Sequence, residues 1–142
     1  MRNLTVLALA AMAACAAHAE VYNVSPGMSI QEVVNSSVSG DTIILEDGLH
    51  TARVILNGRD LTIASRFLLD GDESHIIGTI VQADTSNPDT ASCFVYVCGE
   101  TPASRLVGLD LMNGRGTRDF YYLSLPCGGA VYMQATPSSN AG

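Results

Sequence analysis

Residues Leu61–Val81 read LTIASRFLLDGDESHIIGTIV and combine the main features of the chain. Two runs rich in β-branched residues, LTIAS (61–65) and IIGTIV (76–81), are typical of short strands and enclose the segment DGDESH. The titratable residues of this segment are Asp70, Asp72, Glu73 and His75. Gly71 can adopt a positive φ, and aspartate side chains accept hydrogen bonds from nearby backbone N–H groups. We therefore interpret DGDESH as a turn between strands, with its charges in solvent.

A metal site at DGDESH does not fit the spacing. A calcium loop of the EF-hand type that starts at Asp70 needs Gly at its sixth position and Glu at its twelfth, but those positions hold His75 and Val81. A zinc site lacks a second histidine at short spacing, because His50 lies 25 residues before His75. The sequence therefore predicts no catalytic, cofactor-binding or metal-binding residues.

Short strands dominate the rest of the chain. Further strand-like runs occur at 41–45, 53–56, 93–97, 106–111 and 130–133. Turn signals separate most of them, at Asp47-Gly48, Asn57-Gly58, Asp70-Gly71 and Asn113-Gly114. Strands of four or five residues with uneven gaps favour a solenoid over a sandwich or barrel, whose hairpins need longer alternating strands.

The runs can be grouped into coils. Strands near 43, 54 and 63 would form one coil, strands near 79, 95 and 109 the next, and GGAVYM would open a third. One short helix is expected over 29–37, where Ser29 and Glu32 form a capping box. This helix would cover the first coil, since an uncovered coil end is an unpaired sheet edge.

The order of these pieces resembles a known family. A helix followed by SGDTIILEDGLHTARVIL, LTIAS, LVGLDLMNGRGT and GGAVYM is similar to exported bacterial proteins of the pectin-lyase-like superfamily. The resemblance covers about residues 24–133. It implies an all-β fold, a right-handed parallel β-helix of about two coils plus the start of a third, with a short N-terminal capping helix. Members usually continue for several more coils, so the resemblance also implies that this chain is an N-terminal fragment.

An enzyme of this family would need stacked acidic residues, such as the carboxylate pair of a glycosidase, which lies about 5 to 9.5 Å apart. Asp110 is the carboxylate at the centre of an expected strand, and its expected neighbour in the earlier coil is Thr62 or Ala64. We therefore interpret Asp110 as an outward, solvated residue. The loop that follows contains three further charged residues, for which a sugar-binding role has no support: Arg115, Arg118 and Asp119.

The N-terminus predicts export. The apolar run from Leu4 to Cys15 has about twelve residues, whereas a membrane-spanning helix needs about twenty. Ala17-His18-Ala19 has the form of a signal-peptidase site. We expect a signal peptide over 1–19, an N-terminal segment with the capping helix over 20–40 and a partial β-helix over 41–142, secreted or at the bacterial cell surface. The alternative is a lipoprotein anchored through Cys15.

The net charge of the chain limits the kinds of partner that it can bind. Without residues 1–19 the chain keeps six Arg against fourteen Asp and Glu, and it contains no Lys. Nucleic acid would be repelled by this net negative charge, and the missing lysine excludes P-loop and Schiff-base chemistry.

Three cysteines follow the expected signal peptide. Five strand steps of about 3.3 Å would place Cys93 and Cys98 about 16 Å apart, beyond the Cα separation of about 7 Å that a disulfide allows. A bridge would then use Cys127, and buried apolar thiols are the open alternative.

The N-terminal sequence predicts an exported protein, and the family resemblance implies that it binds or processes polysaccharide; no catalytic site is expected in this chain. One alternative is a fragment of a polysaccharide lyase or glycoside hydrolase whose active site lies in further coils. The other is a surface adhesin or structural spacer.

Overall fold

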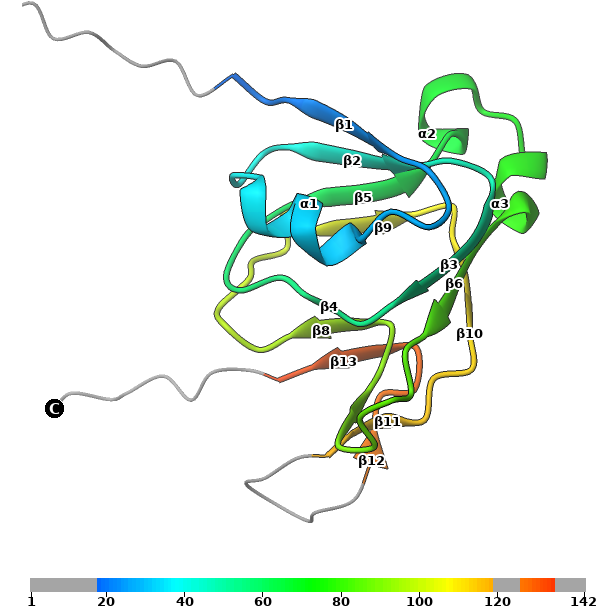
Figure 1. The fold of residues 1–142 in the computed structure, drawn as a ribbon. Coiled ribbons are helices and arrows are strands. Elements are labelled where there is room, and N and C mark those ends of the chain that lie inside the picture. Colours follow the sequence, from blue (N-terminus) through cyan, green and yellow to red (C-terminus); the bar gives the residue numbers. More distant parts are fainter. Residues whose placement is uncertain (1–17, 119–125, 135–142) are drawn as a thin grey trace, which may run out of the picture.

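The computed structural model describes residues 18–118 and 126–134. In this part the chain is mainly β, with three short helices among short strands, so the expected all-β class is confirmed. The strands form three parallel sheets and one antiparallel sheet, which we call A to D (Figure 1).

Sheet A contains β1 (Val21–Val24), β2 (Thr42–Leu45), β5 (Thr62–Ser65) and β9 (Arg105–Val107), in that order. Sheet B contains β3 (Gly48–Ala52), β6 (Thr79–Ala83) and β10 (Asp110–Met112). Sheet C contains β4 (Val54–Ile55), β8 (Phe94–Tyr96) and β13 (Val131–Met133). Sheet D is antiparallel and contains β7 (Thr90–Ala91), β11 (Gly116–Arg118) and β12 (Pro126–Cys127).

The chain visits sheets A, B and C three times in the same order. The first pass is β2, β3 and β4, the second is β5, β6 and β8, and the third is β9, β10 and β13. Each strand pairs in parallel with its equivalent in the neighbouring pass, as β2, β5 and β9 do where they lie side by side in Figure 1.

The expected grouping of strands near 43, 54 and 63 into one coil is wrong. Ile63 is the parallel register partner of Ile43, so it belongs to the following pass. The strand missing from the expected grouping is β3, the middle strand of the first pass, whose sequence GLHTA has no β-branched run. The corner before β3 is only Glu46-Asp47, because Gly48 adopts a φ of 134° and turns the chain at once into sheet B.

Inward side chains form one column in each parallel sheet. The column of sheet A is Tyr22, Ile43, Ile63 and Leu106. That of sheet B is His50, Val81 and Leu111, and that of sheet C is Val54, Phe94 and Val131. All members from the first two passes in these columns are buried, so the core lies between the three sheets.

Helix α1 (Ile30–Ser36) begins where the capping box predicts. The Ser29 side chain accepts a hydrogen bond from the backbone N–H of Glu32 at 3.3 Å. Ile30 and Val34 are buried on its inner face, and the helix contacts β1 and β4. The predicted helix is therefore confirmed, and it covers the start of the first pass.

Between β5 and β6 the chain forms two short helices, α2 (Phe67–Asp70) and α3 (Ser74–Gly78). We call residues 66–78 the insertion. The expected strand over 76–81 is therefore only half right, because strand structure starts at Thr79. The expected turn is confirmed at Gly71, which has a φ of 74° and separates the two helices.

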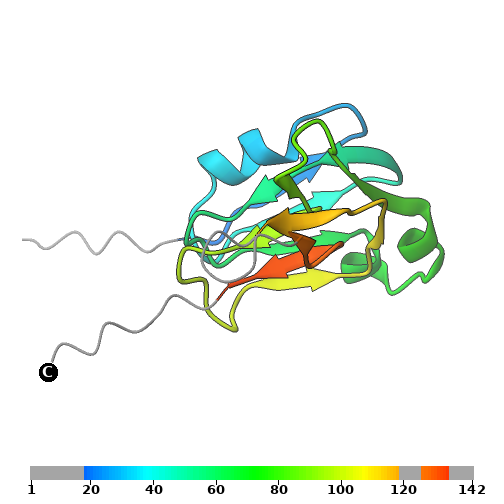
Figure 2. The same ribbon diagram turned by 90° about the horizontal axis from the view of Figure 1, so that it is seen from below.

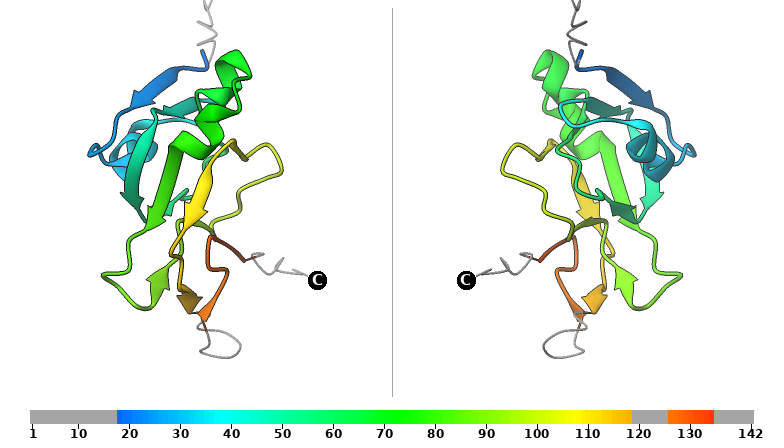
Figure 3. Two further views of the ribbon diagram at one scale, coloured as in Figure 1. Left: turned by 90° about the vertical axis from the view of Figure 1, so that its right-hand side faces the viewer. Right: turned by 90° about the vertical axis from the view of Figure 1, so that its left-hand side faces the viewer.

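The helices and sheet D mark different sides of the molecule. Figure 2 shows α1 and the insertion on opposite sides of the strand layers. Sheet D lies at the far end from the insertion, as both views of Figure 3 show.

Candidate functional site

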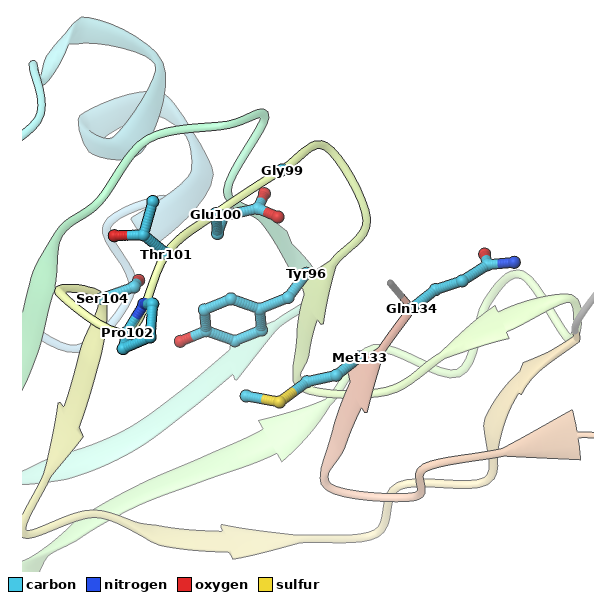
Figure 4. Close-up of a pocket in the computed structure, with 8 residues that line it drawn as sticks. All are labelled: Tyr96, Gly99, Glu100, Thr101, Pro102, Ser104, Met133 and Gln134. Carbon is cyan, nitrogen blue, oxygen red and sulfur yellow. The ribbon is translucent and has the colours of Figure 1, made fainter. Parts of the chain in front are cut away.

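A cavity of about 520 Å³ lies where sheet C meets the loop 97–104. Tyr96 ends β8 and Met133 ends β13, and the two are register partners. The loop supplies the opposite wall, and Figure 4 shows the Tyr96 ring between this wall and the Met133 thioether. The full lining is Tyr96, Gly99, Glu100, Thr101, Pro102, Ser104, Met133 and Gln134. We call this cavity the Tyr96 pocket.

Two carboxylates fix the shape of the loop. Glu100 accepts hydrogen bonds from the backbone N–H of Gly58 and of Cys98, both at 3.0 Å. Asp60 accepts from the backbone N–H and the hydroxyl of Thr101, both at 2.7 Å. The Thr101 hydroxyl, followed by its N–H, lowers the pKa of Asp60. Because Gly58 and Asp60 belong to the loop that follows β4, the first-pass loop supports the second-pass loop.

The pocket offers neutral polar groups beside an apolar floor. Burial raises the pKa of the Tyr96 hydroxyl, so this phenol is neutral at physiological pH. Gln134 Oε1 accepts a hydrogen bond from the Tyr132 hydroxyl at 3.2 Å, and its side-chain nitrogen is a further donor. The lining contains no Arg, Lys or His. Such a surface suits a neutral polar ligand that also has apolar faces.

A second hollow of similar volume lies between the start of α1 and β3, and it is lined by Arg53 and Asp84 among others. Arg53 Nη1 is buried and has no hydrogen-bond partner among the described residues. The positive charge of Arg53 contributes to lowering the pKa of Asp84, after the hydrogen bonds from Ser86. Arg53 and Asp84 carry opposite charges and line the same groove. A charged ligand attracted by one of them would be repelled by the other, so the groove does not favour a ligand of either charge.

The DGDESH segment contacts a carboxylate from another part of the chain, Asp47. His75 Nδ1 lies 2.7 and 2.9 Å from the two carboxylate oxygens of Asp47, and His75 Nε2 lies 3.2 Å from Asp70 Oδ2. The hydrogen bond to Asp47 is the main reason that the pKa of His75 is raised. We call these three residues the histidine cluster.

The aspartates of DGDESH also have the expected turn role. Asp70 accepts from the backbone N–H of Asp72, and Asp72 accepts from that of Ser74, both at 2.9 Å. The bonds from Ser74 lower the pKa of Asp72. Turn chemistry is therefore confirmed, but the contact with Asp47 could not be seen within the segment itself.

The remaining sequence candidates neither line the Tyr96 pocket nor belong to the histidine cluster. Asp110 is exposed, as expected, but its register partner in the preceding pass is Ile80 and not Thr62 or Ala64. Arg115 and Arg118 are exposed, and Arg118 of β11 forms an ion pair at 3.0 Å with Asp89, which precedes β7. Asp119 lies outside the described residues.

The cysteines differ in their surroundings. Cys93 is buried and donates to the carbonyl oxygens of Val81 at 3.4 Å and Met112 at 3.7 Å. Burial raises the pKa of this thiol. Cys98 is exposed, and neither Cys93 nor Cys98 forms a disulfide. Of the open alternatives, Cys93 fits the buried apolar thiol.

Across residues 18–118 and 126–134, no group of three or more His, Cys, Asp or Glu side chains has an arrangement that could hold a metal ion. The same part of the chain contains no helix with the length and apolar character needed to cross a membrane. In comparisons with known proteins, no family model, curated protein or solved structure matches the chain.

Proposed function

We propose that this chain is an exported protein with a polysaccharide-binding role at the cell surface, built on the first turns of a right-handed parallel β-helix. The threefold return of the chain to sheets A, B and C supports the fold. A solenoid buries one continuous core by stacking equivalent strands, and the three side-chain columns fit that principle. Export rests on the N-terminal sequence 1–19, most of which lies outside the described residues.

The Tyr96 pocket is the single observation that carries the binding role. Sugars combine hydroxyl groups with apolar ring faces, and pockets that take small ligands combine an apolar lining with a few placed polar groups. Tyr96 and Met133 supply the apolar surface, and Ser104 and Gln134 supply hydrogen-bonding groups. The lining has no cation, and its one charged side chain, Glu100, would repel an anionic sugar. The Glu100 carboxylate already accepts two backbone N–H groups, so the proposed ligand is a neutral sugar unit.

Binding of neutral oligosaccharides to the purified protein, measured by titration calorimetry, tests this role. Met133→Ala should weaken binding severalfold, because Met133 is a wall of the pocket. Met112→Ala is the matched control, since Met112 is also exposed at the end of a third-pass strand but lies in sheet B. Equal losses for the two variants would contradict the assignment to this pocket.

The same titration separates the competing functions. Hydrolysis or eliminative cleavage of the oligosaccharide would favour a lyase or hydrolase. If neither neutral nor uronic acid oligosaccharides bind, the polysaccharide role is wrong, and an adhesin or spacer becomes the better interpretation. Stronger binding of uronic acid oligosaccharides would contradict the choice of a neutral ligand.

A further inference from the structure

The corner between sheets A and B differs among the three passes. In the first pass it is Glu46-Asp47, and in the third it is Gly108-Leu109. In the second pass the same corner contains the whole insertion, residues 66–78. The insertion is therefore a long corner between two short ones, and it can be held from both sides.

The side toward the third pass is held by packing. Gly108 has a φ of 63°, and a Cβ atom there would lie 2.8 Å from Ser65 Oγ and 3.1 Å from a ring carbon of Phe67. Phe67 at the start of α2 therefore rests against a corner that only glycine allows.

The side toward the first pass is held by Asp47. A Cβ atom at Gly78 would lie 3.2 Å from the Asp47 carboxylate carbon, so the absence of a side chain lets the carboxylate approach α3. Asp47 then accepts hydrogen bonds from His75 Nδ1 and from the Thr79 hydroxyl, the latter at 3.3 Å. This contact links residues that are 28 positions apart in the sequence.

Both nitrogens of the His75 ring face carboxylates, one on each side. Neutral imidazole has a single N–H, which the hydrogen bond to Asp47 uses. Imidazolium adds a positive charge, which holds Asp70 in an ion pair at 3.2 Å. The shorter distance is on the Asp47 side, 2.7 Å against 3.2 Å on the Asp70 side. A neutral ring would therefore keep its proton on Nδ1 and turn an unprotonated Nε2 toward Asp70.

The charged groups around His75 are mainly acidic. α3 packs against α2, β6 and β10. Asp70 comes from α2, Asp72 and Glu73 from the turn, and Asp110 from β10, while β6 has no charged residue. The nearest arginine in the sequence is Arg66, which is exposed before α2. Asp47, Asp70 and Asp72 each favour the protonated ring.

We propose that His75 is a pH-dependent latch of the insertion: as imidazolium it joins Asp47 to Asp70, and when it releases its proton to solvent it stays on Asp47 and frees Asp70. The end of α2 then loosens from α3, while α3 remains attached to the first-pass corner. Leu68 and Leu69 on α2 and Ile77 on α3 are already exposed, so loosening α2 from α3 changes how these apolar side chains are placed relative to one another.

The direction of the pH dependence follows from the sign of the pKa shift of His75. The pKa of His75 is raised in the folded chain above its ordinary value of about 6.5. The latch is therefore fully closed below about pH 6.5 and opens as the pH rises through the raised pKa.

Nuclear magnetic resonance of the purified protein between about pH 6 and pH 9 tests the latch. We expect the His75 midpoint above its ordinary value and, at high pH, a ring protonated on Nδ1. The Asp70 carboxyl and the Gly71 amide, which donates to Phe67 at 2.9 Å, should shift with the same midpoint. A proton on Nε2 at high pH, or a Gly71 amide that does not respond, would overturn the latch.

Three substitutions sharpen this test. Asp47→Asn should move the His75 midpoint to lower pH by more than Asp70→Asn does, because the Asp47 contact is shorter. Glu73→Gln is the control, since it removes one negative charge from the same turn without touching the ring. An equal shift in Glu73→Gln and Asp47→Asn would show that only general charge acts on His75, and would contradict the geometric latch.

Discussion

The strand stack is covered differently at its first-pass end and at its third-pass end. At the first pass, β1 pairs with β2 and α1 lies against β4, and the inward residues Ile43 and Val54 are fully buried. At the third pass, the corresponding residues Leu106 and Val131 are only partly buried. Among the described residues, β9, β10 and β13 are edge strands at this end. β3 and β4 are edge strands at the first-pass end, where α1 lies against β4. Within the described residues, the first-pass end is therefore more deeply covered than the third-pass end, and we call them the sealed end and the open end. The free energy of unfolding should reflect this difference in burial.

The largest effect is expected from the core column of sheet A. Ile63→Ala should cost about 2 to 5 kcal/mol, because Ile63 is fully buried between two neighbouring passes. Leu106→Ala removes a side chain of the same size from the open end and should cost about half as much or less. Urea denaturation measures both, and equal costs would contradict the distinction between sealed and open ends.

A smaller loss of stability is expected at the third-pass corner, where Gly108 lies close to neighbouring side chains. Gly108→Ala should cost about 2 to 4 kcal/mol, because it combines a left-handed backbone with a close contact to Ser65 and Phe67. Gly71→Ala is the matched variant, since Gly71 also has a positive φ but a Cβ atom there meets nothing within 4 Å. It should cost only about 1 to 2 kcal/mol. If Gly71→Ala proved the more damaging, the packing of the insertion on the third-pass corner would be wrong.

The next largest loss of stability is expected from removing the N-cap of α1. Ser29→Ala should cost about 1 kcal/mol, because it removes the acceptor for the Glu32 N–H at the start of the helix over the first pass. Ser39→Ala is a useful comparison outside the helix, since the Ser39 hydroxyl accepts from the backbone N–H of Asp60 at 3.1 Å in an exposed hydrogen bond. Thermal unfolding followed by circular dichroism compares the two, and a Ser29→Ala variant as stable as the wild type would mean that α1 does not seal the first pass.

The smallest effect is a dependence on pH. A group with a raised pKa in the folded state contributes stability that is present below its unfolded pKa and lost as the pH rises through the folded pKa. His75 should therefore make the melting temperature fall slightly between about pH 6.5 and its raised pKa. His75→Gln should remove this slope. A slope that persists in His75→Gln would have to come from another group.

Much of the fold could be predicted from local chemistry. The capping pair Ser29 and Glu32 placed α1, and the turn signal at Gly71 was correct because a positive φ is a local requirement. The strand β3 was missed because its inward residue is His50, a buried polar side chain that breaks the apolar pattern. Without β3, the strands could not be assigned to the correct pass.

The candidate sites were less visible in the sequence. α2 and α3 have four and five residues, too few to show a helical period. The contact between Asp47 and His75 joins different corners, and the Tyr96 pocket joins the ends of β8 and β13. Such contacts depend on how the passes stack, which spacing along the chain does not give.

A measurement of the strand register in sheet A tests the threefold arrangement of passes most directly. The assignment of strands to passes, the side-chain columns and both sites all depend on this register. Nuclear Overhauser effects between backbone protons should connect Ile63 to Ile43 on one side and to Leu106 on the other. Contacts from Ile63 to Leu109 in place of these two would restore the grouping of 43, 54 and 63 into one coil, and would contradict the three passes described above.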